Sequence, residues 1–193
     1  MAGKQAKLLT DFMVTAMIKH IRKNRYPDRD IVIILLSTKA GLRAGEIAQL
    51  TWQMVLDANG KVGKLIELHD IAAKKLHGRT IPINPLLRHS LIKLHKLQDF
   101  PLSGEVILSE RKTPIKPASI VKWFKLLYNA LGYNGCSSHS GRRSFVTKAA
   151  RNIHLVGGSL KDVQQLAGHC SLETTQAYIE GDSNIKRKLI NLL

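Results

Sequence analysis

The stretch Ser138–Tyr178, SHSGRRSFVTKAARNIHLVGGSLKDVQQLAGHCSLETTQAY, holds most of the chemically distinctive residues of this chain. His139 precedes Arg142 by three residues, His169 follows a glycine, and Tyr178 lies nine residues after that histidine. Two histidines, an arginine and a phenol can together stabilise and attack a phosphodiester. The stretch therefore predicts phosphate chemistry, for which the rest of the chain should supply further cations.

Serines in the same stretch predict where its helices begin. Ser138 and Ser171 are expected to cap helices, and Ser159 with Asp162 resembles a capping box. The helix after Ser138 would carry the histidine and arginines of the first cluster, and the helix after Ser171 would carry Tyr178. The C-terminal part is therefore predicted to be helical.

The N-terminal half contains further helical patterns on both sides of a short region with strand-like segments. Apolar spacing and caps predict helices at about 11–24, 30–40, 43–50, 85–98 and 117–131. Residues 52–83 contain the short, partly β-branched segments TWQMVLD, KLIELH and RTIPI, which predict a three-stranded antiparallel sheet. Val106–Ser109 is expected to be extended, and Trp52 and Trp123 to lie in the core.

These elements fit one mainly α domain with a small three-stranded antiparallel sheet. Its expected bounds are residues 10–183, after a flexible basic leader at 1–9 and before a C-terminal tail helix at 184–193. The tail contains the amphipathic sequence IKRKLINLL, which is too short to be a stable helix alone.

The charge of the chain predicts a polyanionic partner. Thirty Lys and Arg oppose fourteen Asp and Glu, a formal net charge of +16. Such an excess most often serves nucleic-acid binding, with a merely solvated basic surface as the alternative. The apolar run Ile31–Leu36 is too short to span a bilayer, and no basic stretch has the apolar face of an interfacial helix. The two cysteines, Cys136 and Cys170, have no metal-finger spacing, and a reducing intracellular compartment is a simpler interpretation than a disulfide between them.

Four motifs occur along the chain in a fixed order. The first is KAGLRAGEIAQLTW at residues 39–52, which contains Arg43 and Glu46. In the second, Lys74 lies eight residues before Pro82, and Pro82 belongs to a strand-like segment. The third is HSGRR at residues 139–143, and the fourth is LAGHCSLETTQAY at residues 166–178.

Together these motifs resemble those of the tyrosine recombinases of the phage-integrase and Xer type, and the likeness extends from about Leu9 to Tyr178. The resemblance implies the DNA breaking-rejoining catalytic-domain fold of that family. Gly141 departs from the larger apolar residue that is usual in the third motif, which is expected to loosen packing there. Lys39-Ala40 replaces a threonine that is usual in the first.

The residues themselves suit the cleavage of a phosphodiester. The planar guanidiniums of Arg43 and Arg142 can each hold two non-bridging oxygens. Tyr178 needs a base or nearby cations before it becomes a good nucleophile. His139 is a general acid/base candidate, and His169 is expected to donate a hydrogen bond to the phosphate.

The resemblance adds the remaining roles. It implies a covalent 3′-phosphotyrosyl intermediate at Tyr178, and a reaction without ATP, divalent metal or cofactor. It assigns the general acid for the departing 5′-oxygen to Lys74, with the adjacent Lys75 as the alternative. Glu46 is expected to orient His139 or Arg43, or to form an ion pair with Arg43.

Several basic residues outside these motifs are candidates for DNA contact. Arg22, Lys23 and Arg25 form a cluster that also suits the negative end of the first helix. The other candidates are Lys75, Arg79 and Arg143.

The chain is therefore predicted to be a site-specific recombinase or integrase acting on double-stranded DNA. Alternatives are a type IB topoisomerase-like relaxing activity, a non-catalytic DNA-binding regulator with the same fold, and an unrelated nucleic-acid-binding module. Assembly of two to four copies on DNA through the 184–193 tail is expected by resemblance, with an accessory DNA-bending protein as an optional partner. A prokaryotic or viral origin would place the protein in the cytoplasm, at the nucleoid. Members of the family usually have a further N-terminal DNA-clamping domain, so the chain is either minimal or part of a longer one.

Overall fold

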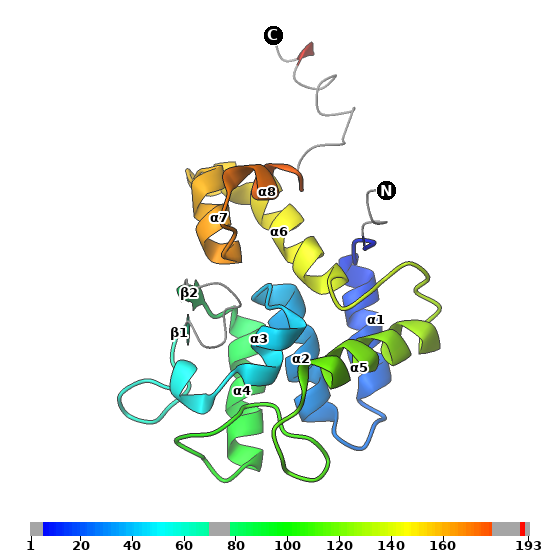
Figure 1. Cartoon of the computed structure of the whole chain (residues 1–193), viewed down its shortest axis with the longest axis vertical. Helices are drawn as coiled ribbons and strands as arrows, with labels where there is room; N and C mark the ends of the chain where they lie inside the picture. The colour runs from blue at the N-terminus through cyan, green and yellow to red at the C-terminus, as the bar shows by residue number, and fades with distance from the viewer. Residues whose placement is uncertain (1–5, 70–77, 179–189, 192–193) are drawn as a thin grey trace. The chain divides into compact units, whose positions relative to one another are not determined.

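The computed structural model describes residues 6–69, 78–178 and 190–191 (Figure 1). The chain divides into two compact units, Met1–Phe145 and Val146–Leu193. The single domain predicted at 10–183 therefore spans both units, each of which is described separately below. Among the described residues, no helix combines the length and the apolar character needed to cross a membrane.

The first unit is mainly helical, as predicted. Its helices are α1 (Asp11–Ile21), α2 (Pro27–Lys39), α3 (Ala44–Gln49), α4 (Pro85–Leu97) and α5 (Pro117–Ala130), and α6 (Ser140–Asn152) begins in it (Figure 1). The helix α2 packs against α1, α3 and α4. Contact on several sides explains why its run from Val32 to Leu36 is completely buried.

Local sequence signals explain where these helices begin. The side chain of Thr10 accepts a hydrogen bond from the Met13 amide at the start of α1, and Asn84 accepts one from the Leu86 amide at the start of α4. The first helical residue of α2, α4 and α5 is a proline, which lacks the N–H group that a helix start leaves unused.

The sheet is smaller than predicted. Strands β1 (Leu65–Leu68) and β2 (Arg79–Pro82) pair antiparallel, with Leu65 opposite Pro82. The first of the three expected strands is instead a 3₁₀ turn, Trp52–Met54. Trp52 anchors this turn in the core, because it is fully buried and its Nε1 donates to Gln98 Oε1 at 3.0 Å. The adjacent Met54 and Val55 are both buried, which does not fit a strand that alternates its side chains between two faces.

Two further expectations about the first unit are only partly met. Val106–Ser109 forms no named strand, although Leu108 makes an isolated bridge to Pro114. Trp123 is half-buried rather than in the core. It lies beside the fully buried Phe124, with the ring centroids 5.0 Å apart.

Two glycines allow close packing around the start of α6. Gly41 has φ +66°, and a Cβ built on it would lie 2.3 Å from the Phe145 ring. A Cβ on Gly141 would lie 2.2 Å from Ser37 Oγ on α2. The expectation that Gly141 loosens packing is therefore wrong, because its missing side chain lets α6 approach α2 closely.

The second half of the predicted leader is anchored to the first unit. The Lys7 amide donates to the Gly135 carbonyl at 3.0 Å, and the Leu9 amide donates to Ser144 Oγ at 2.6 Å. Arg143 also donates to the Ala6 carbonyl. Residues 6–9 are therefore not a loose segment, and Leu9 is part of the core.

The second unit contains the remainder of α6, a 3₁₀ turn (Ile153–Val156), α7 (Leu160–Ala167) and α8 (Leu172–Gln176). The predicted capping box is present at Ser159, whose side chain and amide interact with Asp162. Ser171 caps α8 by accepting from the Thr174 amide, as expected. Tyr178 lies just beyond α8 rather than on it.

Candidate active site

In the first unit, predicted site residues gather around Arg43 and Glu46. Arg43 lies directly before α3, and Glu46 lies in its first turn. The Arg43 amide donates to Glu46 Oε2 at 2.8 Å, and its guanidinium donates to Oε1 at 2.7 Å. The Arg43 side chain remains 37% exposed, whereas that of Glu46 is 2% exposed. One buried carboxylate thus orients an arginine that can still reach a ligand.

Arg79 on β2 completes this ion-pair cluster. Its guanidinium donates to both oxygens of Glu46, at 2.8 and 3.0 Å. Burial alone would raise the pKa of Glu46, but the hydrogen bonds and charge of Arg79, and then those of Arg43, lower it to about 2. Glu46 is therefore ionised throughout the physiological pH range and suits a positioning role rather than proton transfer.

Arg142 binds a main-chain oxygen that lies close to Arg43 in the sequence. Its Nη1 donates to the Gly41 carbonyl at 2.7 Å, and the residue is 4% exposed. Gly41 lies two residues before Arg43, in the turn that leads into α3. Arg142 thus contacts the same short turn, Gly41 to Arg43, that carries the other predicted arginine clamp.

His139 lies immediately before α6 and is exposed. Its amide donates to Ser137 Oγ at 3.3 Å, and its carbonyl accepts from the Arg143 amide at 2.8 Å. The side-chain bonds at this helix start thus involve Ser137, and also Ser140, whose Oγ accepts from the Ser137 amide. The predicted helix begins two residues after Ser138, which leaves the imidazole of His139 at the surface.

The second unit brings His169 and Tyr178 together. Their rings are stacked, with centroids 5.5 Å apart and planes 19° apart. His169 Nδ1 lies 2.9 Å from Thr175 Oγ1, and the Tyr178 amide donates to the Thr175 carbonyl at 3.1 Å. Gly168, at φ +61°, ends α7 and turns the chain toward His169.

The other predicted site residues fall into three groups. Lys74 and Lys75 lie outside the described residues, as does most of the 184–193 tail. Arg22, Lys23 and Arg25 are exposed at the end of α1, and Arg25 lies 3.7 Å from Glu110. The guanidinium groups of Arg79 and Arg143 make the protein contacts described above, and their proposed contact with DNA stays a prediction.

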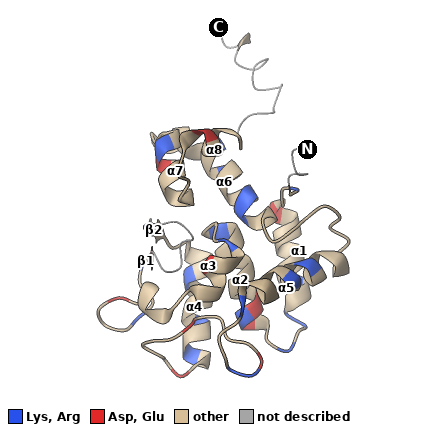
Figure 2. Cartoon of the chain, in the orientation of Figure 1, with Lys and Arg blue, Asp and Glu red and all other residues tan. Residues whose placement is uncertain are grey.

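Basic side chains recur on three successive helices. The sequences of α4, α5 and α6 contain Lys or Arg but no Asp or Glu, and Figure 2 colours the Lys and Arg positions of these helices blue. Such helices suit a negatively charged partner.

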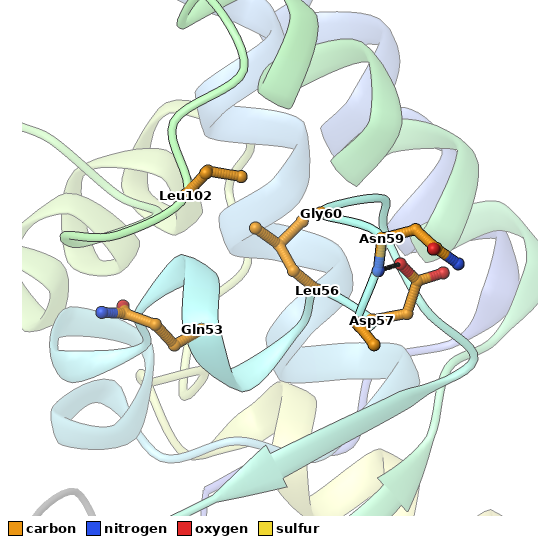
Figure 3. Close-up of a pocket in the computed structure, with 7 residues that line it drawn as sticks. Gln53, Leu56, Asp57, Asn59, Gly60 and Leu102 are labelled. Carbon is orange, nitrogen blue, oxygen red and sulfur yellow. Dashed lines mark hydrogen bonds between the residues drawn. The ribbon is translucent and has the colours of Figure 1, made fainter.

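A hollow beside the turn at residues 56–60 is not part of the candidate site. It is lined by Gln53, Leu56, Asp57, Asn59, Gly60 and Leu102 (Figure 3). The Asp57 carboxylate is occupied by the turn itself, because Oδ1 accepts from the amides of Asn59 and Lys61 at 2.9 and 3.0 Å. None of the predicted catalytic residues lines this hollow.

Two contacts of the site were not anticipated from sequence. Arg79 was expected to contact DNA, but it binds Glu46 across 33 residues of sequence. Thr175 was not singled out, because the sequence does not show which of the two adjacent threonines faces inward until the start of the helix is known.

The comparison with protein families gives one match over almost the whole chain. The model of the phage integrase family matches residues 7–184. Tyrosine recombinase XerC of Mesorhizobium japonicum is 30% identical over 153 residues, which cover 77% of this chain and 43% of the relative. Tyrosine recombinase XerA of Pyrococcus furiosus is 31% identical over 174 residues, which cover 89% and 56%. The chain thus spans about half the length of these curated relatives.

Solved structures share the fold. The crystal structure of XerA recombinase matches with a TM-score of 0.74 and 20% identity, covering 96% of this chain and 64% of that one. XerH site-specific recombinase, bound to its difH substrate before cleavage, matches with a TM-score of 0.70 and 20% identity, covering 98% and 55%. The mainly helical fold with a small antiparallel sheet is therefore that of a tyrosine recombinase catalytic domain.

Proposed function

Because the chain belongs to the phage integrase family, we propose that it is a tyrosine-type site-specific DNA recombinase. Tyr178 attacks a phosphodiester of double-stranded DNA and forms a covalent 3′-phosphotyrosyl bond, which releases a 5′-hydroxyl. Attack by a 5′-hydroxyl on this bond then restores the phosphodiester and frees the tyrosine. Since each step exchanges one phosphoester for another, rejoining needs no ATP.

The anchoring of both arginines at one turn carries this proposal. Arg142 donates a hydrogen bond to the Gly41 carbonyl. Arg43 lies two residues after Gly41, and its guanidinium donates to Glu46. In-line attack places additional negative charge on the non-bridging oxygens, and cations that are already fixed stabilise that charge without reorganisation. The two guanidiniums are assigned this role.

The other residues complete the reaction. His169 donates a hydrogen bond to the phosphate. His139 accepts the proton of the Tyr178 hydroxyl during attack and returns it when the tyrosine is released. Lys74, or else Lys75, protonates the departing 5′-oxygen. Glu46 acts through Arg43 and is a positioning residue.

DNA and further copies of the chain are the proposed partners. XerH is bound to its difH substrate in its crystal structure, and Tn1549 transposon integrase has been solved in complex with a circular intermediate DNA. We expect the 184–193 tail to contribute to assembly on DNA, with an optional accessory DNA-bending protein. Deletion of residues 184–193 should then reduce multimers in a native-gel assay on two-site DNA while monomer binding persists.

Trapping of the covalent intermediate tests the proposed function. Nicked suicide duplexes with a random sequence around the nick lose a short strand after cleavage, so the protein–DNA adduct accumulates and is visible on a denaturing gel. We expect an adduct with the wild type, none with Tyr178→Phe, and an undiminished one with Tyr26→Phe as the matched control. Sequencing of the trapped DNA would give the target site.

The same assay separates the competing functions. No adduct with the wild type would support a non-catalytic DNA-binding protein and overturn the proposal. An adduct that persists in Tyr178→Phe would show that another residue is the nucleophile. If the trapped site is placed twice on a supercoiled plasmid, a recombinase yields exchanged products, whereas relaxation without exchange indicates a topoisomerase-like enzyme.

A further inference from the structure

Two adjacent threonines of α8 have different environments. Thr175 is fully buried, and its Oγ1 lies 2.9 Å from His169 Nδ1. Thr174 is exposed, and its hydroxyl lies 3.1 Å from Ser171 Oγ in the helix cap. The two positions therefore separate a hydroxyl that faces the candidate site from one that faces the helix start.

The buried hydroxyl of Thr175 defines the proton position on His169. Within the described part of the chain, His169 Nδ1 is the one hydrogen-bond partner of this hydroxyl. Elsewhere, the hydroxyls of Thr15 and Thr38 donate to main-chain carbonyls four residues earlier, at 2.9 and 2.8 Å. A buried O–H group without an acceptor is costly, so the Thr175 proton must point at Nδ1. A neutral imidazole that accepts at Nδ1 carries its own proton on Nε2.

The main chain of His169 is fixed independently of Thr175. The His169 amide donates to the Gln164 carbonyl at 3.1 Å, and Gln164 Nε2 donates to the His169 carbonyl at 3.0 Å. Loss of the Thr175 hydroxyl would therefore remove this contact of the imidazole ring without releasing the turn that presents His169.

We infer that Thr175 is a positioning residue, whose hydroxyl donates to His169 Nδ1 and fixes the ring with its proton on Nε2. The inference rests on the proposed function, in which His169 is the hydrogen-bond donor to the attacked phosphate. Thr175 also accepts the Tyr178 amide through its main-chain carbonyl, and the Tyr178 ring stacks on His169. One residue thus sets the donor atom of the histidine and the position of the nucleophile's backbone.

The tautomer of His169 is directly measurable in the DNA-free protein. Nitrogen-15 NMR of the imidazole rings, at an alkaline pH where histidine is neutral, distinguishes protonated Nε2 from protonated Nδ1. We expect the Nε2–H form in the wild type, in Thr175→Ser and in the Thr174→Val control, and a mixture of both forms in Thr175→Val. A wild-type ring protonated on Nδ1, or a Thr175→Val spectrum identical to the wild type, would overturn the inference.

A kinetic measurement tests the consequence for cleavage. Single-turnover cleavage of the trapped suicide duplex should be about five- to tenfold slower in Thr175→Val, the effect of one lost hydrogen bond. Thr175→Ser should restore the rate, and DNA affinity should be the same in all variants. An unchanged rate, or equal loss in Thr175→Ser, contradicts a role for the hydroxyl.

The NMR measurement and the cleavage measurement test different claims. If no variant forms an adduct, the proposed function is wrong, whereas the NMR result still decides the hydrogen bond. If Thr175→Val does not fold, as judged by circular dichroism, the wild-type and Thr175→Ser spectra still decide the inference.

Discussion

Glu46 is the residue on which two arginines of the first unit converge. Its pKa is about 2 in the folded protein, compared with an ordinary value of 4.5, because the stabilising contacts of Arg79 and Arg43 outweigh the effect of burial. A lowered folded-state pKa contributes stability that is fully present above about pH 4.5 and is lost as the pH falls toward 2. A difference of this size corresponds to about 3 kcal/mol.

Removal of the negative charge of Glu46 should reveal its contribution to the stability of the fold. Glu46→Gln keeps the shape of the side chain but leaves the buried Arg79 and the partly exposed Arg43 without their carboxylate. We expect the free energy of unfolding at pH 7 to fall by about 3 kcal/mol, as measured by urea denaturation. The loss of stability between pH 4.5 and 2.5 should be smaller in the variant than in the wild type.

An exposed carboxylate of the same unit provides the control. Glu67 lies on the exposed face of β1, and Glu67→Gln should change the free energy of unfolding by less than about 0.5 kcal/mol. If Glu46→Gln and the wild type lost stability equally on acidification, the Arg79–Glu46–Arg43 cluster would not be the source of the pH dependence.

The motifs predicted contacts between neighbouring residues better than contacts between residues distant in sequence. Arg43 and Glu46 lie three residues apart near a helix start, so their pairing follows from local geometry. Arg79 reaches Glu46 only because β2 passes beside α3, and nothing in the spacing of 33 residues encodes that approach. Likewise, the inward direction of Thr175 depends on where α8 begins, and helix boundaries are the least certain part of a sequence-based prediction.

At the scale of elements, the close contact of α6 with α2 depends on a missing side chain. The Cβ of an alanine at position 141 would overlap Ser37 Oγ at 2.2 Å and would lie 3.1 Å from Thr38 Cγ2. Packed interiors have little free space, so the Ser37 side chain would have to rotate or one of the helices would have to move.

Gly141→Ala should therefore be destabilising, although alanine normally favours a helix. We expect a loss of about 2 kcal/mol in the free energy of unfolding, measured by chemical denaturation. The matched control is Gly45→Ala in α3, where a Cβ would meet nothing within 4 Å. That substitution should be neutral or stabilising by up to about 1 kcal/mol.

A second substitution identifies the cause of the expected loss. The Ser37 hydroxyl is buried and has no hydrogen-bond partner within the described part of the chain, so Ser37→Ala alone should be nearly neutral. Combined with Gly141→Ala, it removes the clashing oxygen and should recover about half of the lost stability. No recovery in the double variant would mean that the contact with α2 is not the reason for glycine at this position.

The success of the element predictions follows the strength of the local signals. Asn84-Pro85 and Pro117 marked α4 and α5 correctly, because a cap or proline acts within its own turn of helix. The segment at 51–57 misled the prediction, since its apolar residues fit a strand by composition. The burial of Trp52 beside His95 of α4 decides the conformation of this segment, and that contact lies far along the chain.

At the scale of the whole molecule, the net charge of +16 is the property that most affects binding to a polyanion. A polyanion that binds such a chain releases counterions, so its affinity depends on salt. We expect the affinity of Tyr178→Phe for a mixed-sequence duplex to fall roughly 10³-fold between 50 and 200 mM salt, as measured by fluorescence anisotropy. An affinity independent of salt would contradict binding through the phosphate backbone.

The cluster at the end of α1 can be tested in the same assay. If Arg22, Lys23 and Arg25 contact phosphates, their replacement by alanine should reduce the salt slope by roughly 0.9 per lost contact. Replacement of three exposed lysines elsewhere, Lys61, Lys64 and Lys112, removes the same charge and should leave the slope nearly unchanged. Equal effects of the two triple variants would indicate net charge alone.

The Gly41–Arg142 bond has a consequence for mutational robustness. The acceptor is a main-chain carbonyl, and every amino acid provides one, so no single substitution can delete it. A side chain at position 41 can only displace it, because the positive φ and the nearby Phe145 ring leave no room. An alanine scan would therefore report Gly41 as a packing residue and would miss the oxygen that anchors Arg142.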